Sequence, residues 1–114
     1  MSIDLIKNYT SNIEQEIYDK KRILDAYDKY GDELFYRECE MMHFTSSSII
    51  INKNRDKVLM IYHNIYHSWS WLGGHADGET DLLKVALKEA REESGIHHVK
   101  PASEQIYSLE VLTV

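Results

Sequence analysis

The stretch from residue 73 to residue 95, GGHADGETDLLKVALKEAREESG, decides the fold that we expect. It opens with two adjacent glycines, and after Asp81 it contains no glycine or proline until Gly95. Asp is a favoured helix N-cap, and Gly is a favoured residue just beyond a helix C-terminus. The stretch therefore predicts a glycine loop followed by a helix that begins after Asp81 and ends at Gly95.

Helical geometry gathers three glutamates of this stretch on one face. At about 100° of rotation per residue, the side chains sort into an acidic face (Glu89, Glu92, Glu93), an apolar face (Leu83, Ala86, Leu87, Ala90) and a basic face (Lys84, Lys88, Arg91). Neighbouring acids repel one another, and the C-terminal end of a helix favours cations. Two interpretations remain: a solvated acidic face, or a site for a divalent cation that neutralises the acids.

A divalent cation also suits the glycines that precede the helix. Mg²⁺ and Mn²⁺ prefer carboxylate and carbonyl oxygens. At Gly73 and Gly74 the absence of side chains lets the backbone approach a bound ion or phosphate closely. The loop and the helix are thus expected to converge on one site.

Upstream of this region the pattern predicts helices. Apolar residues recur at helical spacing from Asn12 to Tyr30, with Ser11 as the expected N-cap and Gly31 as the expected stop. Residues 2 to 9 are expected to form a shorter, separate helix. This N-terminal part is interpreted as a packing arm, with a dimerisation or lid element as the alternative.

The remaining segments predict strands. Residues 44–51 (FTSSSIII) and 58–62 (VLMIY) are rich in β-branched or apolar residues and flank a polar turn at 52–56, which indicates an antiparallel hairpin. The three consecutive isoleucines indicate a strand buried on both faces. The stretch QIYSLEVLTV at 105–114 is also typical of a strand. The order of elements predicts an α/β fold with a mixed sheet and helices on more than one side.

Size and charge narrow the classes of function. A chain of 114 residues is expected to form one domain, and a net charge of -6 argues against binding to a nucleic-acid polymer. No apolar run is long enough to span a bilayer, so we expect no membrane partner. The N-terminus lacks a signal-peptide pattern, and Cys39 has no second cysteine to pair with, which favours a cytoplasmic protein.

Residues 69 to 96 resemble the Nudix box, especially that of bacterial Nudix hydrolases with a GGHADG loop. The spacing of the box is matched without a gap by Gly74, Glu89, Ala90, Glu92, Glu93, Gly95 and Ile96. The preceding WSWLGG is similar to the aromatic approach to that box. The sequence departs from the box at two positions, where Thr80 replaces the first glutamate and Lys88 replaces the arginine.

The resemblance implies a Nudix-like α/β/α sandwich over residues 32–114, preceded by a helical extension over residues 1–31. It implies Mg²⁺-dependent hydrolysis (or Mn²⁺-dependent) of a pyrophosphate bond in a nucleoside diphosphate linked to another moiety. The implied metal ligands are the Gly73 carbonyl and the carboxylates of Glu89, Glu92 and Glu93, with Glu92 or Glu93 as the catalytic base.

The resemblance also directs attention to groups that contact a small phosphorylated substrate, namely Gly74, His75, Trp71 and Lys88. For His75 the alternative is a loop histidine that hydrogen-bonds the backbone. Trp69 and Trp71 lie two apart, so one strand face carries both, and either stacking on a nucleobase or core packing explains them.

The sheet of this family normally continues beyond the point at which the sequence stops, Val114. Two interpretations follow: the sequence is a piece of a longer protein, or it is a shortened protein that completes its sheet with a second copy, as a homodimer. Function likewise has two candidates, a pyrophosphohydrolase and a non-catalytic nucleotide- or metal-binding module on the same scaffold.

Overall fold

Residues 2–112, which the computed structural model describes, form a mixed α+β fold with small antiparallel sheets. The elements are α1 (Ser2–Asn8), α2 (Glu14–Tyr30), the 3-10 helix η1 (Gly31–Phe35), β1 (Thr45–Ser48), β2 (Ile50–Ile51), β3 (Val58–Leu59), β4 (Ile61–His63), β5 (Ser68–Ser70), β6 (Leu72–His75) and α3 (Leu82–Ser94). The expected combination of helices and strands is confirmed. The expected mixed sheet is not found in this part of the chain, where every strand pairing is antiparallel. None of its helices has the length and apolar character needed to cross a bilayer.

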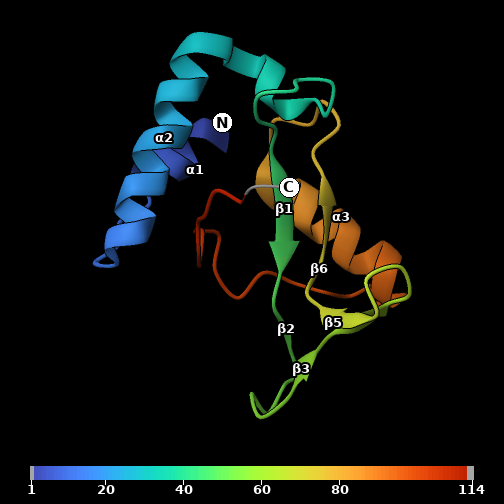
Figure 1. Cartoon of the computed structure of the whole chain (residues 1–114). Coiled ribbons are helices and arrows are strands. Elements are labelled where there is room, and N and C mark those ends of the chain that lie inside the picture. The colour runs from blue at the N-terminus through green and yellow to red at the C-terminus, as the bar shows by residue number, and fades with distance from the viewer. Residues whose placement is uncertain (1, 113–114) are drawn as a thin grey trace.

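The centre of the fold is the pair β1–β6 with α3 packed across it (Figure 1). The strands run antiparallel, with Thr45 opposite His75 and Ser48 opposite Leu72. Small and polar side chains let the helix approach closely, and the Ser46 hydroxyl donates a 2.9 Å hydrogen bond to the Leu82 carbonyl. Because side chains alternate along a strand, Thr45 and Ser47 point to the opposite face and are exposed.

The limits of α3 agree with the expectation from the sequence. The Asp81 carboxylate accepts a hydrogen bond from the Lys84 amide, and Gly95 ends the helix in the left-handed conformation. The buried face is rotated slightly from the expected one. It consists of Leu82, Val85, Ala86 and Ala90, whereas Leu83 and Leu87 are only half-buried.

The N-terminal helices pack beside this unit and share its core (Figure 1). The expected short first helix and the stop at Gly31 are confirmed. The expected N-cap at Ser11 is wrong, since α2 begins at Glu14. The Ser11 hydroxyl instead accepts a bond from the Ile13 amide and donates one to Glu16. The shared core consists of Ile3, Ile6, Ile23, Leu34, Phe35, Phe44, Ala76, Leu82 and Val85.

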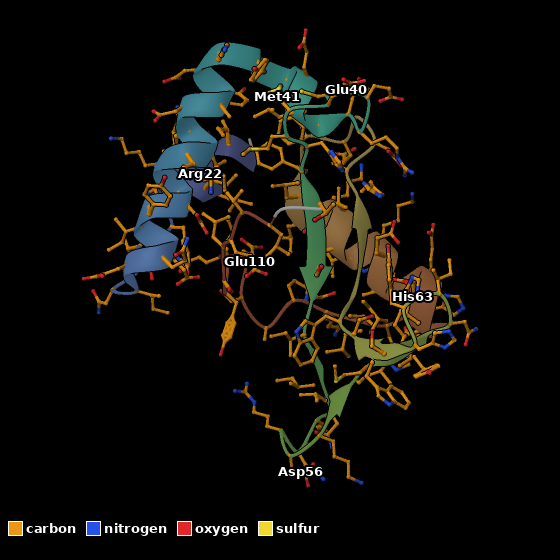
Figure 2. The ribbon with its side chains drawn as sticks, in the orientation of Figure 1. Arg22, Glu40, Met41, Asp56, His63 and Glu110 are labelled. Atoms are coloured by element: carbon orange, nitrogen blue, oxygen red, sulfur yellow. The ribbon has the colours of Figure 1, made fainter. Side chains whose placement is uncertain are left out.

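The hairpin expected from residues 44–62 is present, but it is not buried. Strands β2 and β3 pair around the turn, whose Asp56 lies at the far end of the molecule from α2 (Figure 2). The expectation of a strand buried on both faces is wrong, because Ile49 and Ile51 are exposed. The reason is that β2 lies beyond α3, and among the described strands it pairs with β3 alone.

The strand expected at 105–114 is also wrong for residues 105–112, and residues 113–114 lie outside the described residues. This segment runs back between α2 and β1 (Figure 1). Its backbone amides bond to side chains of α2 instead of a neighbouring strand. The Leu109 amide donates to Glu16 at 2.9 Å and the Val111 amide donates to Asp19 at 3.1 Å. The two carboxylates thus hold an irregular segment that forms no sheet.

This arrangement predicts acid-sensitive stability. Hydrogen bonds from Ser11 and from the Leu109 amide hold the pKa of Glu16 below its ordinary value. A depressed folded pKa means that the stabilisation is present above the unfolded pKa, about 4.3, and is lost as pH falls through the folded pKa. In urea unfolding, the wild type should exceed Glu16→Gln in stability near neutral pH, and the difference should shrink on acidification.

The matched control is Glu14→Gln, which changes an exposed carboxylate in the same turn of α2. Its difference from the wild type should be small at every pH. A gap between wild type and Glu16→Gln that persists unchanged down to pH about 3, below the ordinary carboxyl range, would contradict the role given to Glu16.

Candidate metal and phosphate site

The end of α3 lies against the glycines of β6, as the sequence predicts. The Gly73 amide donates a 2.8 Å hydrogen bond to Oε1 of Glu93. In an antiparallel strand the N–H and C=O of one residue point to the same edge. The Gly73 carbonyl is therefore directed to the edge of β6 that carries the Glu93 carboxylate, so two of the expected ligands share one location. We call this edge, at Gly73 and Gly74, the glycine edge.

Glu89 occupies the space that a side chain at position 74 would fill. A Cβ added to Gly74 would lie 2.7 Å from Cδ of Glu89 and 2.8 to 2.9 Å from its two carboxylate oxygens. The backbone of Gly74 is not left-handed, so what the missing side chain provides is room for the Glu89 carboxylate. The Glu89 carboxylate is thereby brought directly onto the backbone of β6.

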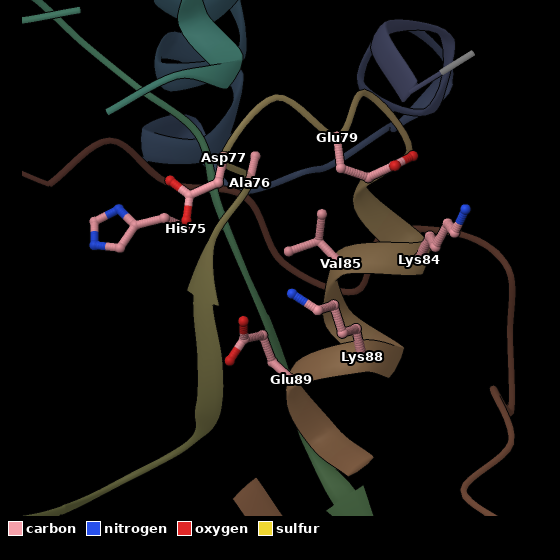
Figure 3. A pocket seen from close by; sticks show the side chains of 8 residues that line it. All are labelled: His75, Ala76, Asp77, Glu79, Lys84, Val85, Lys88 and Glu89. Carbon is pink, nitrogen blue, oxygen red and sulfur yellow. The ribbon is translucent and has the colours of Figure 1, made fainter. Parts of the chain in front are cut away.

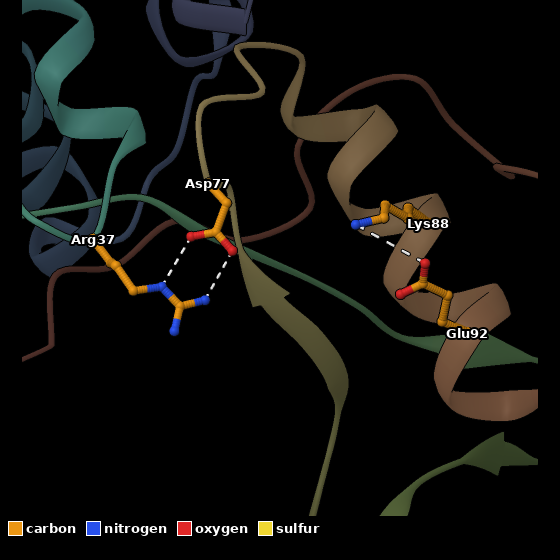
Figure 4. A network of polar contacts seen from close by, with 4 residues as sticks. All are labelled: Arg37, Asp77, Lys88 and Glu92. Atoms are coloured by element: carbon orange, nitrogen blue, oxygen red, sulfur yellow. Dashed lines mark hydrogen bonds and ion pairs between the residues drawn. The ribbon is translucent and has the colours of Figure 1, made fainter.

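Glu92 is directed differently from the other two acids. Its carboxylate lies 3.9 Å from Nζ of Lys88, one turn earlier on α3, and both side chains are exposed (Figure 4). Within residues 2–112, no three His, Cys, Asp or Glu side chains are gathered into a group that could hold a metal ion. The structure thus brings Glu89 and Glu93 to the glycines, with Glu92 paired to Lys88 on the adjoining surface.

A cavity of about 240 Å³ lies beside Glu89, between the start of α3 and the loop that follows β6. Its lining residues are His75, Ala76, Asp77, Glu79, Lys84, Val85, Lys88 and Glu89 (Figure 3). The Lys88 amine points into this space. Glu89 therefore borders both the cavity and Gly74, and Lys88 borders the cavity and pairs with Glu92, whereas Gly73, Glu92 and Glu93 are not among the residues that line it.

His75 contributes less to this cavity than its position suggests. Its ring points to the side of β6 opposite Glu89 and Lys88 (Figure 3) and stacks at 5.1 Å on His43. Its buried Nδ1 has no hydrogen-bond partner in the described part of the chain. The alternative in which this histidine bonds the backbone is thus not supported at Nδ1.

The two tryptophans are exposed. Trp69 is 65% accessible and Trp71 is 42% accessible, and Trp69 packs edge-on against Tyr62. Core packing therefore does not explain either residue. Trp71 lies between β5 and β6, two positions before Gly73 in the sequence.

Thr80, which replaces the first glutamate of the box, lies in a different place. It lines a second cavity, of about 330 Å³, together with Asp4 and Asn8 of α1 and Asp81. It does not line the cavity beside Glu89. Its substitution for an acid thus alters the side of the loop that faces the N-terminal helix.

Sequence reasoning missed one interaction at this site. The guanidinium of Arg37 donates two hydrogen bonds, of 2.9 and 2.8 Å, to the carboxylate of Asp77 (Figure 4). These bonds hold the pKa of Asp77 below its ordinary value, and the charges of His75 and Lys88 act in the same direction. The residues are 40 positions apart, and no local pattern relates them.

In comparison with known proteins, no family model matches the chain and no curated protein is significantly similar to it. The interpretation of the site therefore depends on its own geometry.

The two glycines should respond differently to substitution. A Cβ at Gly73 would lie 2.7 Å from the Ser46 carbonyl and 2.8 Å from Cα of Ser47, both of which are backbone atoms. The first contact at Gly74 is instead the end of a flexible side chain. In urea unfolding, Gly73→Ala should lose about 1 to 3 kcal/mol, and Gly74→Ala should lose clearly less because Glu89 can swing away. Equal losses in the two variants would contradict this assignment.

Proposed function

We propose that this protein is a Mg²⁺-dependent pyrophosphohydrolase that cleaves a nucleoside diphosphate linked to another moiety, on a Nudix-like scaffold. The proposal includes the finer fold expected from that resemblance, a sandwich with helices on both faces of a sheet, and Mn²⁺ as a substitute cation.

The observation that carries the proposal is the meeting of two acids with two glycines. Glu93 accepts a hydrogen bond from the Gly73 amide, and the Glu89 carboxylate lies on Gly74. Acids at the C-terminal end of a helix are opposed by the helix dipole. Two acids brought to one stretch of backbone also repel each other, and a bound cation would remove that repulsion.

The chemistry of the donors fits a hard divalent cation. Carboxylates of Glu89 and Glu93, together with the Gly73 carbonyl, are oxygen ligands of the kind that Mg²⁺ and Mn²⁺ prefer. Glu92 would join them by leaving Lys88, and its ion pair is long and solvent-exposed, so little holds it there. When bound, the cation would neutralise charge on the diphosphate and lower the pKa of an attacking water.

Different residues of the chain would then have different roles around the phosphates. Lys88, whose amine points into the cavity, supplies positive charge to a phosphoryl group beside Glu89. Gly74 lets that group approach the backbone. Glu92 or Glu93 accepts the proton of the attacking water, and Glu92 is the acid that no backbone amide engages in the described structure.

We assign the organic part of the substrate to the exposed ring of Trp71. Trp71 is exposed next to the glycine edge, and aromatic rings stack on nucleobases. His75 is the other side chain assigned to the ligand, and its ring would have to turn to reach it, because Nδ1 is buried in this structure.

A non-catalytic binding module is the second candidate. It is favoured by the pairing of Glu92 with Lys88, which leaves the three glutamates ungathered, and by threonine at position 80. Such a module would bind the same phosphorylated ligand and metal but would not turn it over.

Turnover distinguishes the two candidates. The protein with Mg²⁺ should release phosphate-containing products from at least one member of a panel of nucleoside diphosphate derivatives, followed by chromatography. A chelator should stop the reaction. Glu92→Gln or Glu93→Gln should lower kcat by about 100-fold or more, the usual size of a lost acid–base contribution.

Glu14→Gln, which removes an exposed acid far along the chain on α2, is the matched control and should retain the wild-type rate. If no member of the panel is turned over but a ligand binds saturably, the enzyme function is wrong and the protein is a binding module.

A further inference from the structure

The loop between β6 and α3 is fastened to a segment far away in the sequence. The Gly78 amide donates a 2.7 Å hydrogen bond to the Phe35 carbonyl, and the Ala76 amide donates a 3.2 Å bond to the Phe44 carbonyl. Between these two points lies the two-bond contact of Arg37 with Asp77. The loop is thus bound at three successive residues, 76, 77 and 78, by the segment that links η1 to β1.

This loop contains a tight turn, which the Glu79 amide closes with a 3.0 Å hydrogen bond to the Ala76 carbonyl. Asp77 and Gly78 are both left-handed, with φ of 47° and 91°. Side-chain-bearing residues seldom adopt this conformation, although aspartate does so more readily than most. A Cβ on Gly78 would meet the ring of Tyr36 at 2.9 Å, so the two segments are in close contact. The contacts with the distant segment therefore add to a conformation that the Asp-Gly pair already favours, and they fix where this turn lies in the fold.

The position of the loop matters because it connects the two halves of the candidate site. Gly73 and Gly74 lie immediately before it, and α3 with Glu89 and Glu93 begins immediately after it. The spacing of 2.8 Å between the Gly73 amide and Glu93 requires a fixed placement of α3 along β6. A loop free to relax would let the helix shift and would separate the acids from the glycines.

We propose that Arg37 is a positioning residue for the metal site, acting through Asp77. It does not touch the glutamates itself. Its two parallel hydrogen bonds fix the loop that sets the register of α3 against β6. This inference rests on the proposed function, since it assumes that the glutamates and Gly73 bind a divalent cation.

The rival explanation is an ordinary surface ion pair. Arg37 and Asp77 are 53% and 55% exposed, and exposed pairs usually add little to stability. The two explanations differ in what they alter. A surface pair affects neither binding nor stability much, whereas a positioning pair affects the affinity for metal more than it affects unfolding. Lysine carries the charge of arginine but not its fork, so it should replace a surface pair fully and a positioning pair poorly.

The test measures Mn²⁺ binding by the whole chain, with free Mn²⁺ followed by electron paramagnetic resonance. Arg37→Ala and Asp77→Asn should each weaken binding by about 10-fold, the lower end of the effect of removing a supporting contact around a metal site. Asn is chosen because it tolerates the left-handed backbone. The double variant should be no weaker than either single variant, because both remove the same interaction. Arg37→Lys should fall between the wild type and Arg37→Ala.

Arg22→Ala is the matched control. Arg22 is similarly exposed, at 45%, and pairs with Asp19 on α2, away from α3. It should bind Mn²⁺ as the wild type does. Urea unfolding of every variant accompanies the titration, and Arg37→Lys and Asp77→Asn serve as the decisive variants if Arg37→Ala is unfolded.

Three outcomes would overturn the inference. Wild-type affinity in Arg37→Lys and Asp77→Asn would leave the metal site intact and remove the role of Arg37. An equal loss in Arg22→Ala would show that general destabilisation is responsible. Failure of the wild type itself to bind Mn²⁺ would overturn the proposed function and the positioning role together.

Discussion

The arrangement of the candidate site depends on the absence of a side chain at Gly74. The carboxylate of Glu89 lies against the place that a Cβ at this position of β6 would occupy, so a methyl group there would make Glu89 move away. The small residues Ala86 and Ala90 on the facing side of α3 are buried in the same contact. Close approach of strand and helix follows from these small residues, and it delivers the acidic end of α3 to the glycine edge instead of leaving it in solvent.

Carboxylates that accept hydrogen bonds from backbone amides recur in this fold. Glu93 accepts from Gly73, and on α2 the acids Glu16 and Asp19 accept from Leu109 and Val111. The two uses differ in burial. The acids of α2 are almost fully buried and hold an irregular segment, whereas Glu93 is exposed and can exchange its amide for another partner. The buried acids of α2 thus have a structural role, whereas the exposed Glu93 is open to a ligand.

The sequence predicted features that depend on neighbouring residues. The cap at Asp81 and the stop at Gly95 follow from local geometry, and the approach of glutamates to glycines was expected from the oxygen ligands that a divalent cation prefers. The fastening of Asp77 by Arg37 was not predictable, because it joins residues 40 positions apart that carry no shared pattern. The strand predicted for residues 105–112 was wrong for a related reason, since alternating apolar residues suit either a strand or a segment whose amides bond to Glu16 and Asp19. The burial predicted for the three isoleucines at 49–51 was wrong because it depends on which other elements cover the hairpin.

The central claim is that the acids of α3 and the glycine edge form one cation site. The most direct measurement is a crystal structure of the protein soaked with Mn²⁺, using anomalous scattering to locate the metal. The account predicts a Mn²⁺ peak bound by the Gly73 carbonyl and by carboxylates among Glu89, Glu92 and Glu93, with Glu92 turned away from Lys88. Metal bound elsewhere, with the Gly73 amide still bonded to Glu93 and Glu92 still beside Lys88, would contradict it.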